Sequence, residues 1–471
     1  MSKNKQIGMA LILSVWLLNS CLQAQTQRPN VLLIFTDDQG YQDIGCFGSP
    51  NIKTPHLDQL AAEGRKFTSF YSACSICSPS RAALLTGCYP PRVGLTKVLF
   101  AQDDVGLNPD EITLAEMLKQ VGYRTACIGK WHLGHKPAFL PTRQGFDYYY
   151  GIPYSNDMRI DPTATLAADV VLREGVTVDQ VKKTSVENQK DRLVPLMRNE
   201  EVVEYPADQA SLTRRYTEEA IQFIRESKGQ PFFLYLPHTM PHIPLLASEE
   251  FRGKSKAGLY GDTIEEIDWS VGQLMEAIDE LGLQKETLVI YTSDNGPWNL
   301  RNGHGGSAKP LRGFKFNTYE GGMRVPCIMR WPGHIPAGTE TDEVAATIDL
   351  VPTIAALCHV SIPADRVLDG HDILPLMTDE SATTPHHAYL YYKGNRVSAI
   401  RSGKWKLRTT PENKKKQKPK TMELFDLEAD ISESENVADS YPEKVAELQD
   451  LAAQMDREIK QQSRPIGSLQ K

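Results

Sequence analysis

The chain has 471 residues, enough for one large domain or two medium ones, and with 41% hydrophobic and 24% charged residues it resembles an ordinary soluble globular protein. Its net charge of −7 argues against a nucleic-acid partner and is too small for an acidic, solvating chain. Eight cysteines are unremarkable for a chain of this length, so we expect few or no structural disulfides.

The first residues of the chain predict export. Lys3 and Lys5 precede an apolar stretch at residues 7–18, which is too short for an ordinary membrane span. This is the pattern of a secretory signal peptide, which we place at residues 1–24. Cleavage after Ala24 is one interpretation, and a lipobox at residues 18–21 that leaves a lipid on Cys21 is the other. We expect an exported protein, either periplasmic or an outer-membrane lipoprotein, whose only attachment to a membrane would be that lipid.

Short apolar runs alternate with helical patterns through the middle of the chain, which is typical of βαβ units. The predicted strands are residues 30–36, 125–129, 231–236, 287–293 and 325–331. The predicted helices begin at Thr54, Thr113, Tyr216 and Thr263, and three of these are threonines in N-cap patterns. Over residues 28–384 we therefore expect an α/β fold, with a mixed, mostly parallel central sheet sandwiched by helices.

The pattern changes after about residue 385. Residues 397–401, 404–410 and 422–427 predict strands joined by turns, and a helix follows at residues 442–460. We expect a smaller C-terminal α+β subdomain that carries an antiparallel sheet, over residues 385–465. Residues 413–420, NKKKQKPK, predict the loop of a hairpin.

Polar side chains follow four of the predicted strands. In chain order they are Asp37 and Asp38, Lys130 and His132, His238 and His242, and Asp294 and Asn295. Because ligands bind beyond the carboxyl ends of parallel strands, we expect these side chains to converge. The acidic and amide groups offer the oxygen ligands that Ca²⁺ and Mg²⁺ prefer, and the carboxylates would repel one another without a cation. Helix caps and surface ion pairs are the alternative interpretation.

Residues 75–87, SICSPSRAALLTG, resemble the signature of the type I, formylglycine-dependent sulfatases of the alkaline-phosphatase superfamily. At a residue usage of about 5%, the four fixed residues of C-x-P-S-R recur by chance in roughly one chain in several hundred. The alternative, a buried helical cysteine, does not account for the full run. The resemblance covers roughly residues 28–460, with further blocks at residues 37–40, 129–134, 294–296 and 319–326.

One block departs from the family pattern. Residues 151–157 are similar to a block of the arylsulfatase A branch, in which the sequence usually continues His-Asp-Gln. Here Asn156, Asp157 and Met158 take those places, so we expect recognition of the leaving group to differ.

The resemblance implies a mechanism in which the cysteine is oxidised after translation to Cα-formylglycine, here at Cys77. The aldehyde hydrates to a geminal diol, one hydroxyl attacks sulfur, and the alcohol leaves. The second hydroxyl then expels sulfate and regenerates the aldehyde. An unmodified serine or cysteine has no second hydroxyl and would trap the covalent sulfate.

The resemblance also implies roles for individual residues. One divalent ion, Ca²⁺ or alternatively Mg²⁺, would be held by Asp37, Asp38, Cys77, Asp294 and Asn295. Asp294 would also take the proton of the nucleophile, Arg81 and Lys130 would stabilise the diol, and His132 would orient it. The substrate would contact Ser155, Lys130, His242, which protonates the leaving oxygen, and Lys315, which holds sulfate. His304, in the glycine-rich stretch after Asp294, is a further substrate-binding candidate, whereas we expect Glu320 to anchor its own glycine turn and to pair with Arg324.

We therefore expect a sulfuric ester hydrolase that removes sulfate from a sulfated carbohydrate. Its maturation partner would be a formylglycine-generating or anaerobic sulfatase-maturating enzyme. Two alternatives stay open: a phosphodiesterase or phosphonate monoester hydrolase of the same superfamily, and a non-catalytic glycan-binding lipoprotein. Residues 413–420 would form a solvated loop or, alternatively, a basic lip that attracts a sulfated polymer.

Overall fold

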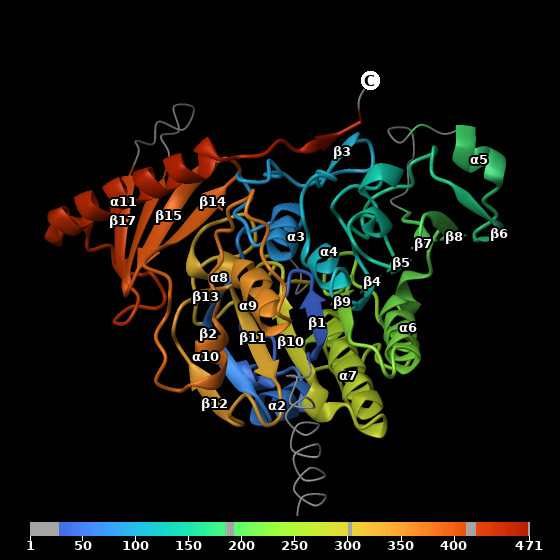
Figure 1. Cartoon of the computed structure of the whole chain (residues 1–471), viewed down its shortest axis with the longest axis horizontal. Coiled ribbons are helices and arrows are strands. Elements are labelled where there is room, and N and C mark those ends of the chain that lie inside the picture. Colours follow the sequence, from blue (N-terminus) through green and yellow to red (C-terminus); the bar gives the residue numbers. More distant parts are fainter. Residues whose placement is uncertain (1–27, 184, 186–192, 300–303, 411–420, 470–471) are drawn as a thin grey trace, which may run out of the picture.

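A computed structural model describes residues 28–183, 185, 193–299, 304–410 and 421–469 (Figure 1). The main body is a twelve-stranded sheet, and a separate four-stranded sheet lies in the C-terminal part of the chain. The fold class predicted from the sequence is confirmed: a mixed sheet between helices and a C-terminal antiparallel sheet. The predicted signal peptide, Cys21 and the basic loop at residues 413–420 lie outside the described residues.

The strand order of the main sheet brings segments far apart in the sequence side by side. The order is β12 (Thr339–Thr341), β2 (Arg65–Tyr71), β11 (Arg324–Arg330), β10 (Thr287–Ser293), β1 (Asn30–Thr36), β9 (Phe232–Pro237), β4 (Arg124–Ile128), β5 (Tyr148–Gly151), β7 (Leu196–Arg198), β8 (Glu201–Tyr205) and β6 (Leu166–Leu172), with β13 (Ala345–Ala346) paired to β2. Strands β10, β1, β9, β4 and β5 are mutually parallel, whereas β11 runs antiparallel to β10. The carboxyl ends of β10, β1, β9 and β4 therefore share one edge of the sheet.

Helices cover both faces of this sheet. They are α2 (Pro55–Ala62), α3 (Cys77–Thr86), α4 (Leu114–Lys119), α5 (Val178–Lys183), α6 (Leu212–Glu226), α7 (Gly258–Glu280), α8 (Glu320–Met323), α9 (Leu350–Leu357) and α10 (Leu374–Thr378). Alternate residues of β1 face opposite cores: Val31, Leu33 and Phe35 pack with α3, α4 and α9, and Leu32 and Ile34 pack with α2, α6 and α7. Because both faces are covered, β1 is apolar from Val31 to Phe35 and buried along its whole length.

The predicted helix starts meet different outcomes. Thr113 forms the predicted capping box with Glu116. The predicted start at Thr263 is wrong, because α7 begins at Gly258 and Thr263 lies inside it. The T-x-x-E pattern misleads there because Glu266 does not reach back along the helix; its carboxylate accepts a hydrogen bond from the backbone N–H of Ser248 instead. The predicted start at Tyr216 is also late, since α6 begins at Leu212.

The C-terminal sheet joins the main body through a buried ion cluster. The sheet consists of β14 (Tyr389–Lys393), β15 (Arg396–Ser402), β16 (Trp405–Thr410) and β17 (Thr421–Asp426), with α11 (Pro442–Gln461) packed against it at the left of Figure 1. Lys406 Nζ lies 2.8 Å from Glu320 and 2.9 Å from Glu433, and all three side chains are fully buried. Burial alone would raise the pKa of Glu320, but Lys406 and Arg324 lower it to about 2. Glu320 thus anchors the chain at this junction.

Two further features of the described residues bear on the sequence predictions. Their seven cysteines are all free. None of their helices combines the length and the apolar character that a membrane crossing requires.

We expect Lys406→Ala to lower the free energy of unfolding by about 3–5 kcal/mol, because it removes the buried cation that pairs with both Glu433 and Glu320. Lys404→Ala is the matched control, since Lys404 pairs with Asp426 at 2.6 Å on a partly exposed surface, where an ion pair contributes far less to stability. Urea unfolding followed by fluorescence measures both. Equal effects of the two substitutions would contradict the junction described here.

Candidate active site

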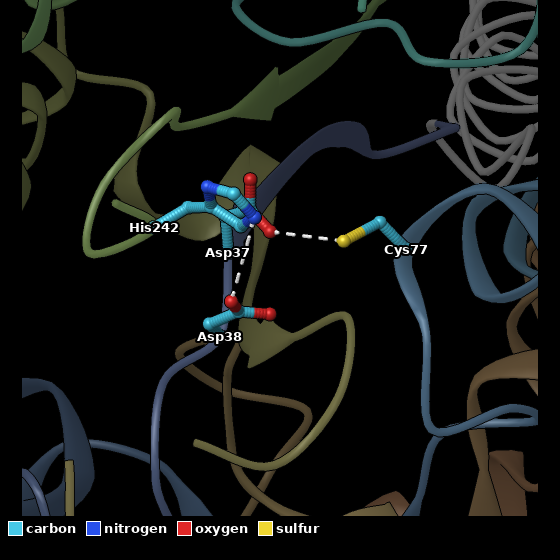
Figure 2. Close-up of side chains that lie close together, drawn as sticks. All are labelled: Asp37, Asp38, Cys77 and His242. Atoms are coloured by element: carbon cyan, nitrogen blue, oxygen red, sulfur yellow. Dashed lines mark hydrogen bonds and ion pairs between the residues drawn. The ribbon is translucent and has the colours of Figure 1, made fainter. Parts of the chain in front are cut away.

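Side chains from separate segments of the chain meet at the shared edge of the sheet. Asp37 and Asp38 follow β1, Cys77 is the first residue of α3, and His242 follows β9. Their ligand atoms all lie within 4.8 Å of one another, and all four side chains are buried. In the view of Figure 2, Cys77 and His242 approach the two aspartates from opposite sides. The structure thus brings together predicted site residues that are up to 205 positions apart, from Asp37 to His242 (242 − 37).

Each of three buried carboxylates in this site has its own buried cation. The pairs are Asp37 with Lys130, Asp38 with Lys315 at 2.7 Å, and Asp294 with Arg81 at 2.9 Å. None of these six residues is more than 2% exposed. Charges this deeply buried are stable only when they are paired and hydrogen-bonded. The three pairs sum to zero, so any divalent cation added here gives the site a net positive charge.

The three cations balance the charge of the carboxylates but do not fully offset the cost of burying Asp294. Burial and the neighbouring Asp37 raise the pKa of Asp294 to about 7, although Arg81 opposes them. Burial also opposes ionisation of Asp37, but Lys130, together with the other positive groups around it, outweighs burial and holds the pKa of Asp37 well below its ordinary value. Further positive charge would therefore stabilise the ionised form of Asp294.

Asn295 provides the observation that favours a metal ion. Its Nδ2 donates to Asp38 Oδ1 at 2.7 Å, whereas its Oδ1 is buried and has no hydrogen-bond partner. A buried amide oxygen without a donor, beside carboxylates, is a ligand that a hard cation such as Ca²⁺ or Mg²⁺ takes. The donor set of Asp37, Asp38, Asn295 and residue 77 therefore fits a divalent ion.

Asp294 lies next to these ligands, but it is not one of the four residues whose ligand atoms all lie within 4.8 Å of one another. Its Oδ1 accepts from the backbone N–H of Asp38 at 3.1 Å, and its Oδ2 accepts from Arg81. His242 is one of those four residues, although its Nε2 is 3.7 Å from Asp38 Oδ2. Asp294 is thus hydrogen-bonded to Arg81 and to the backbone of Asp38, and its predicted role as a metal ligand stays a prediction.

The hydrogen bonds of His242 fix its tautomer. Nδ1 lies 2.9 Å from Asn156 Oδ1 and 2.6 Å from the carbonyl of Ile243, and both are acceptors. Nδ1 therefore carries the proton, and Nε2 is the nitrogen left for a ligand. Burial and Lys315 lower the pKa of His242, while Asp37 and Asp38 oppose this shift. Asn156, at the position where the family pattern is broken, thus positions the histidine.

Lys130 and Ser155 lie on the same side of the site as His242. Ser155 Oγ is 3.3 Å from Lys130 Nζ and 3.4 Å from His242 Nδ1. Gly129 turns the chain with a φ of 133° after β4, and a Cβ atom there would lie 2.0 Å from the carbonyl oxygen of Pro237. Only glycine allows this close approach, which places Lys130 at the carboxylates.

Cys77 is not poised to act as a thiolate. Its Sγ lies 3.4 Å from Asp37 Oδ1 and 3.3 Å from Lys315 Nζ. Burial, with a further contribution from Asp37, raises the pKa of the thiol well above its ordinary value, so the unmodified side chain stays protonated. Its place at the first residue of α3 favours negative charge on a group that replaces the thiol.

His132 has an acceptor available. Its Nε2 lies 2.9 Å from the carbonyl of Leu99, so Nε2 carries the proton and Nδ1 is an acceptor. Nδ1 is buried without a hydrogen-bond partner. Burial, Lys130 and Arg81 lower the pKa of His132 well below its ordinary value, so the ring stays neutral.

Two of the histidine candidates lie away from the cluster. The side chain of His304 is exposed, and among the described residues it makes no hydrogen bond or ion pair with the site. Residues 300–303, just before it, lie outside the described residues. His238, which also follows β9, is instead buried against Ser270 of α7 at 3.4 Å.

Two aromatic residues at the site were not singled out from the sequence. The ring of Trp298 lies 5.5 Å from the ring of His242 and 5.4 Å from the ring of Phe316. Lys315 Nζ lies 4.8 Å from the centre of the Trp298 ring. The sequence feature that could have identified them is adjacency: Trp298 follows the block Asp294-Asn-Gly-Pro297, and Phe316 follows Lys315.

Comparisons with known proteins identify the family. Residues 29–360 match the sulfatase family model, and residues 314–464 match the model described as N-sulphoglucosamine sulphohydrolase, C-terminal. The chain belongs to the sulfatase family. Arylsulfatase A of Bos taurus is 40% identical, over 94% of this chain and 90% of that protein. N-acetylgalactosamine-6-sulfatase of Rattus norvegicus is 38% identical, over 81% and 71%.

A solved structure agrees with this membership. The crystal structure of Ps i-CgsB in complex with k-i-k-neocarrahexaose is 31% identical, covers 93% of this sulfatase and 95% of its own chain, and superposes with a TM-score of 0.80. The resemblance to arylsulfatase A-like sulfatases is confirmed, and the protein is an enzyme that hydrolyses sulfate esters. These matches favour that activity over the phosphodiesterase and the non-catalytic alternatives.

We expect a divalent cation to raise the midpoint of thermal unfolding of the chelator-treated sulfatase by a few degrees at saturation, since it binds only the folded site. Asn295→Ala should shift the required concentration at least about tenfold, because it removes the unpartnered oxygen. Asn156→Ala is the control, since the hydrogen bonds of Asn156 go to His242 and Pro244. If the parent protein, Asn295→Ala and Asn156→Ala gave the same titration curve with Ca²⁺, and again with Mg²⁺, that result would argue against this metal site.

Proposed function

We propose that this sulfatase removes sulfate from a sulfated carbohydrate, with formylglycine formed from Cys77 as the nucleophile and one Ca²⁺ ion as cofactor, Mg²⁺ being the alternative. The observation that carries the proposal is the position of Cys77 between Asp37 and Lys315 in a cluster of three buried carboxylate–cation pairs. The carbohydrate follows from the relatives, one named N-acetylgalactosamine-6-sulfatase and one solved with neocarrahexaose.

The modified residue would supply a diol. One of its hydroxyls would attack the ester, and the other would then release the sulfate. The protonated, buried state of the Cys77 thiol supports this, because an unmodified cysteine here is a poor nucleophile. His132 Nδ1 offers an acceptor for one hydroxyl, which would orient the diol. Asp294, whose raised pKa lies near neutrality, would take the proton of the attacking hydroxyl.

The cations of the site would hold the charge that develops on sulfate. Lys315 and Lys130 would bind its oxygens, with Ser155 next to Lys130, and Arg81 would keep Asp294 and the diol in place. Lys315 stays charged because Asp38 raises its pKa, although burial alone would lower it. Loss of one of these cations should reduce kcat by roughly 10²–10³.

His242 would protonate the leaving oxygen through Nε2. Its pKa is lowered in the free site, but a bound sulfate ester adds negative charge and favours the protonated ring. Asn156 holds Nδ1 of the ring, so the same nitrogen always faces the substrate.

The enzyme would act after export. Residues 1–24 carry the predicted signal peptide: cleavage after Ala24 would release a periplasmic enzyme, whereas lipidation of Cys21 would anchor the mature protein to the outer membrane. A formylglycine-generating or anaerobic maturating enzyme would have to act on Cys77 before folding buries it.

We expect Cys77→Ala and Cys77→Ser to abolish turnover of a panel of sulfated mono- and disaccharides, because neither side chain can form the diol. The mass of the peptide that contains residue 77 checks the modification in the parent enzyme. The same panel should be cleaved at least about tenfold faster than 4-nitrophenyl phosphate. A fully modified, cation-loaded enzyme that cleaves none of the sulfated sugars would refute the proposed function.

We expect His242→Gln to lower kcat about 10²–10⁴-fold for a sugar sulfate and much less for 4-nitrophenyl sulfate, since nitrophenolate leaves without a proton. His238→Gln, a buried histidine four positions earlier, should change neither rate. Equal losses on the two substrates would assign His242 to binding rather than to proton transfer.

A further inference from the structure

The rim of the site carries an aromatic pair that the mechanism above does not use. Trp298 is half-buried, and Phe316 is 41% exposed. Their rings meet edge to face, with centroids 5.4 Å apart and an interplanar angle of 77°. The pair therefore presents apolar ring surface to solvent next to a polar, buried cluster.

The pair is fixed to the groups that would hold the ester. The ring of Trp298 contacts the ring of His242, and Lys315 Nζ lies 4.8 Å from the Trp298 ring and 5.5 Å from the Phe316 ring. Backbone hydrogen bonds hold the segments that carry both rings at the site. Lys315 N–H donates to Pro297 O, and Phe316 N–H donates to Ser75 O. Ser75 lies two residues before Cys77, so these hydrogen bonds fix the position of the rings relative to residue 77.

The backbone conformation of Phe316 indicates that the position of its ring serves a function. Phe316 has a φ of 74°, in the left-handed region that bulky side chains rarely adopt. Asp38 and His132, at φ 65° and 60°, are the other non-glycine residues of the site in this region. Such conformations gather at functional sites, where the surrounding structure enforces them. An exposed phenylalanine gains little from burial, so packing alone does not account for this conformation.

We propose that Trp298 and Phe316 form a stacking wall for the pyranose ring that carries the sulfate, and that they determine the specificity of the enzyme for sugar sulfates. The inference rests on the proposed function. A pyranose has an apolar C–H face that packs against aromatic rings, while its hydroxyls stay free for hydrogen bonds. With sulfate at Lys315 and the leaving oxygen at His242, the sugar of the same ester lies beside the rings that contact both residues.

The test compares a ligand with a sugar ring to one without. The first probe is the sulfated monosaccharide that the parent enzyme cleaves fastest, measured by KM. The second is inorganic sulfate, measured as a competitive inhibitor. We expect Phe316→Gly and Trp298→Ala each to raise KM about tenfold, and to change the inhibition constant of sulfate by less than about threefold.

Phe314→Gly is the matched control, because Phe314 stands on the other side of Lys315 and is 37% exposed. It should change neither constant. Phe316→Gly should also leave the midpoint of thermal unfolding unchanged or raise it by a few degrees, since glycine adopts a φ of 74° without strain.

The outcomes separate this inference from the function on which it rests. If the parent enzyme cleaves no sulfated sugar, the proposed function fails. If it cleaves them and both variants keep the parent KM, only the stacking wall is wrong. A parallel loss of sulfate inhibition and of thermal stability would instead assign the two rings to supporting Lys315 and His242, and would also overturn the proposal.

Discussion

The site depends on the pairing of three buried carboxylates with three buried cations. Removing any one partner would leave an uncompensated charge in the interior, which is far more costly than breaking a surface ion pair. When all three carboxylates are ionised the pairs cancel, so a divalent cation would make the site positive. Under the proposed function, an anionic sulfate ester is attracted more strongly to the second state, in which the metal ion and the three cations would act together on the substrate.

The sheet topology makes this pairing attainable. Strands β10, β1, β9 and β4 are adjacent and parallel, so the residues that follow them meet at one edge although they come from distant parts of the chain. The rule that ligands bind at this edge was enough to predict the convergence from the sequence. Apolar runs located these four strands to within one residue at either end, since both of their faces are covered by helices.

Other features could not be predicted from local pattern. Strand β2 begins with Arg65 and Lys66, and only the tertiary structure buries Arg65 against the carbonyl of Asp379. The start of α7 was misplaced because a capping pattern does not reveal that Glu266 has a partner elsewhere. At the site, the motifs identified the charged residues, but the role of Asn156 and the two rings at the rim arise from contacts between distant segments.

The central claim is that residue 77, converted to an aldehyde within this charged cluster, cleaves the ester. Preparations with different degrees of modification allow a direct measurement of turnover against the aldehyde content of residue 77, determined by peptide mass at saturating Ca²⁺. We predict a straight line through the origin. A preparation whose residue 77 is entirely unmodified cysteine, yet which hydrolyses sulfate esters at the full rate, would contradict the account.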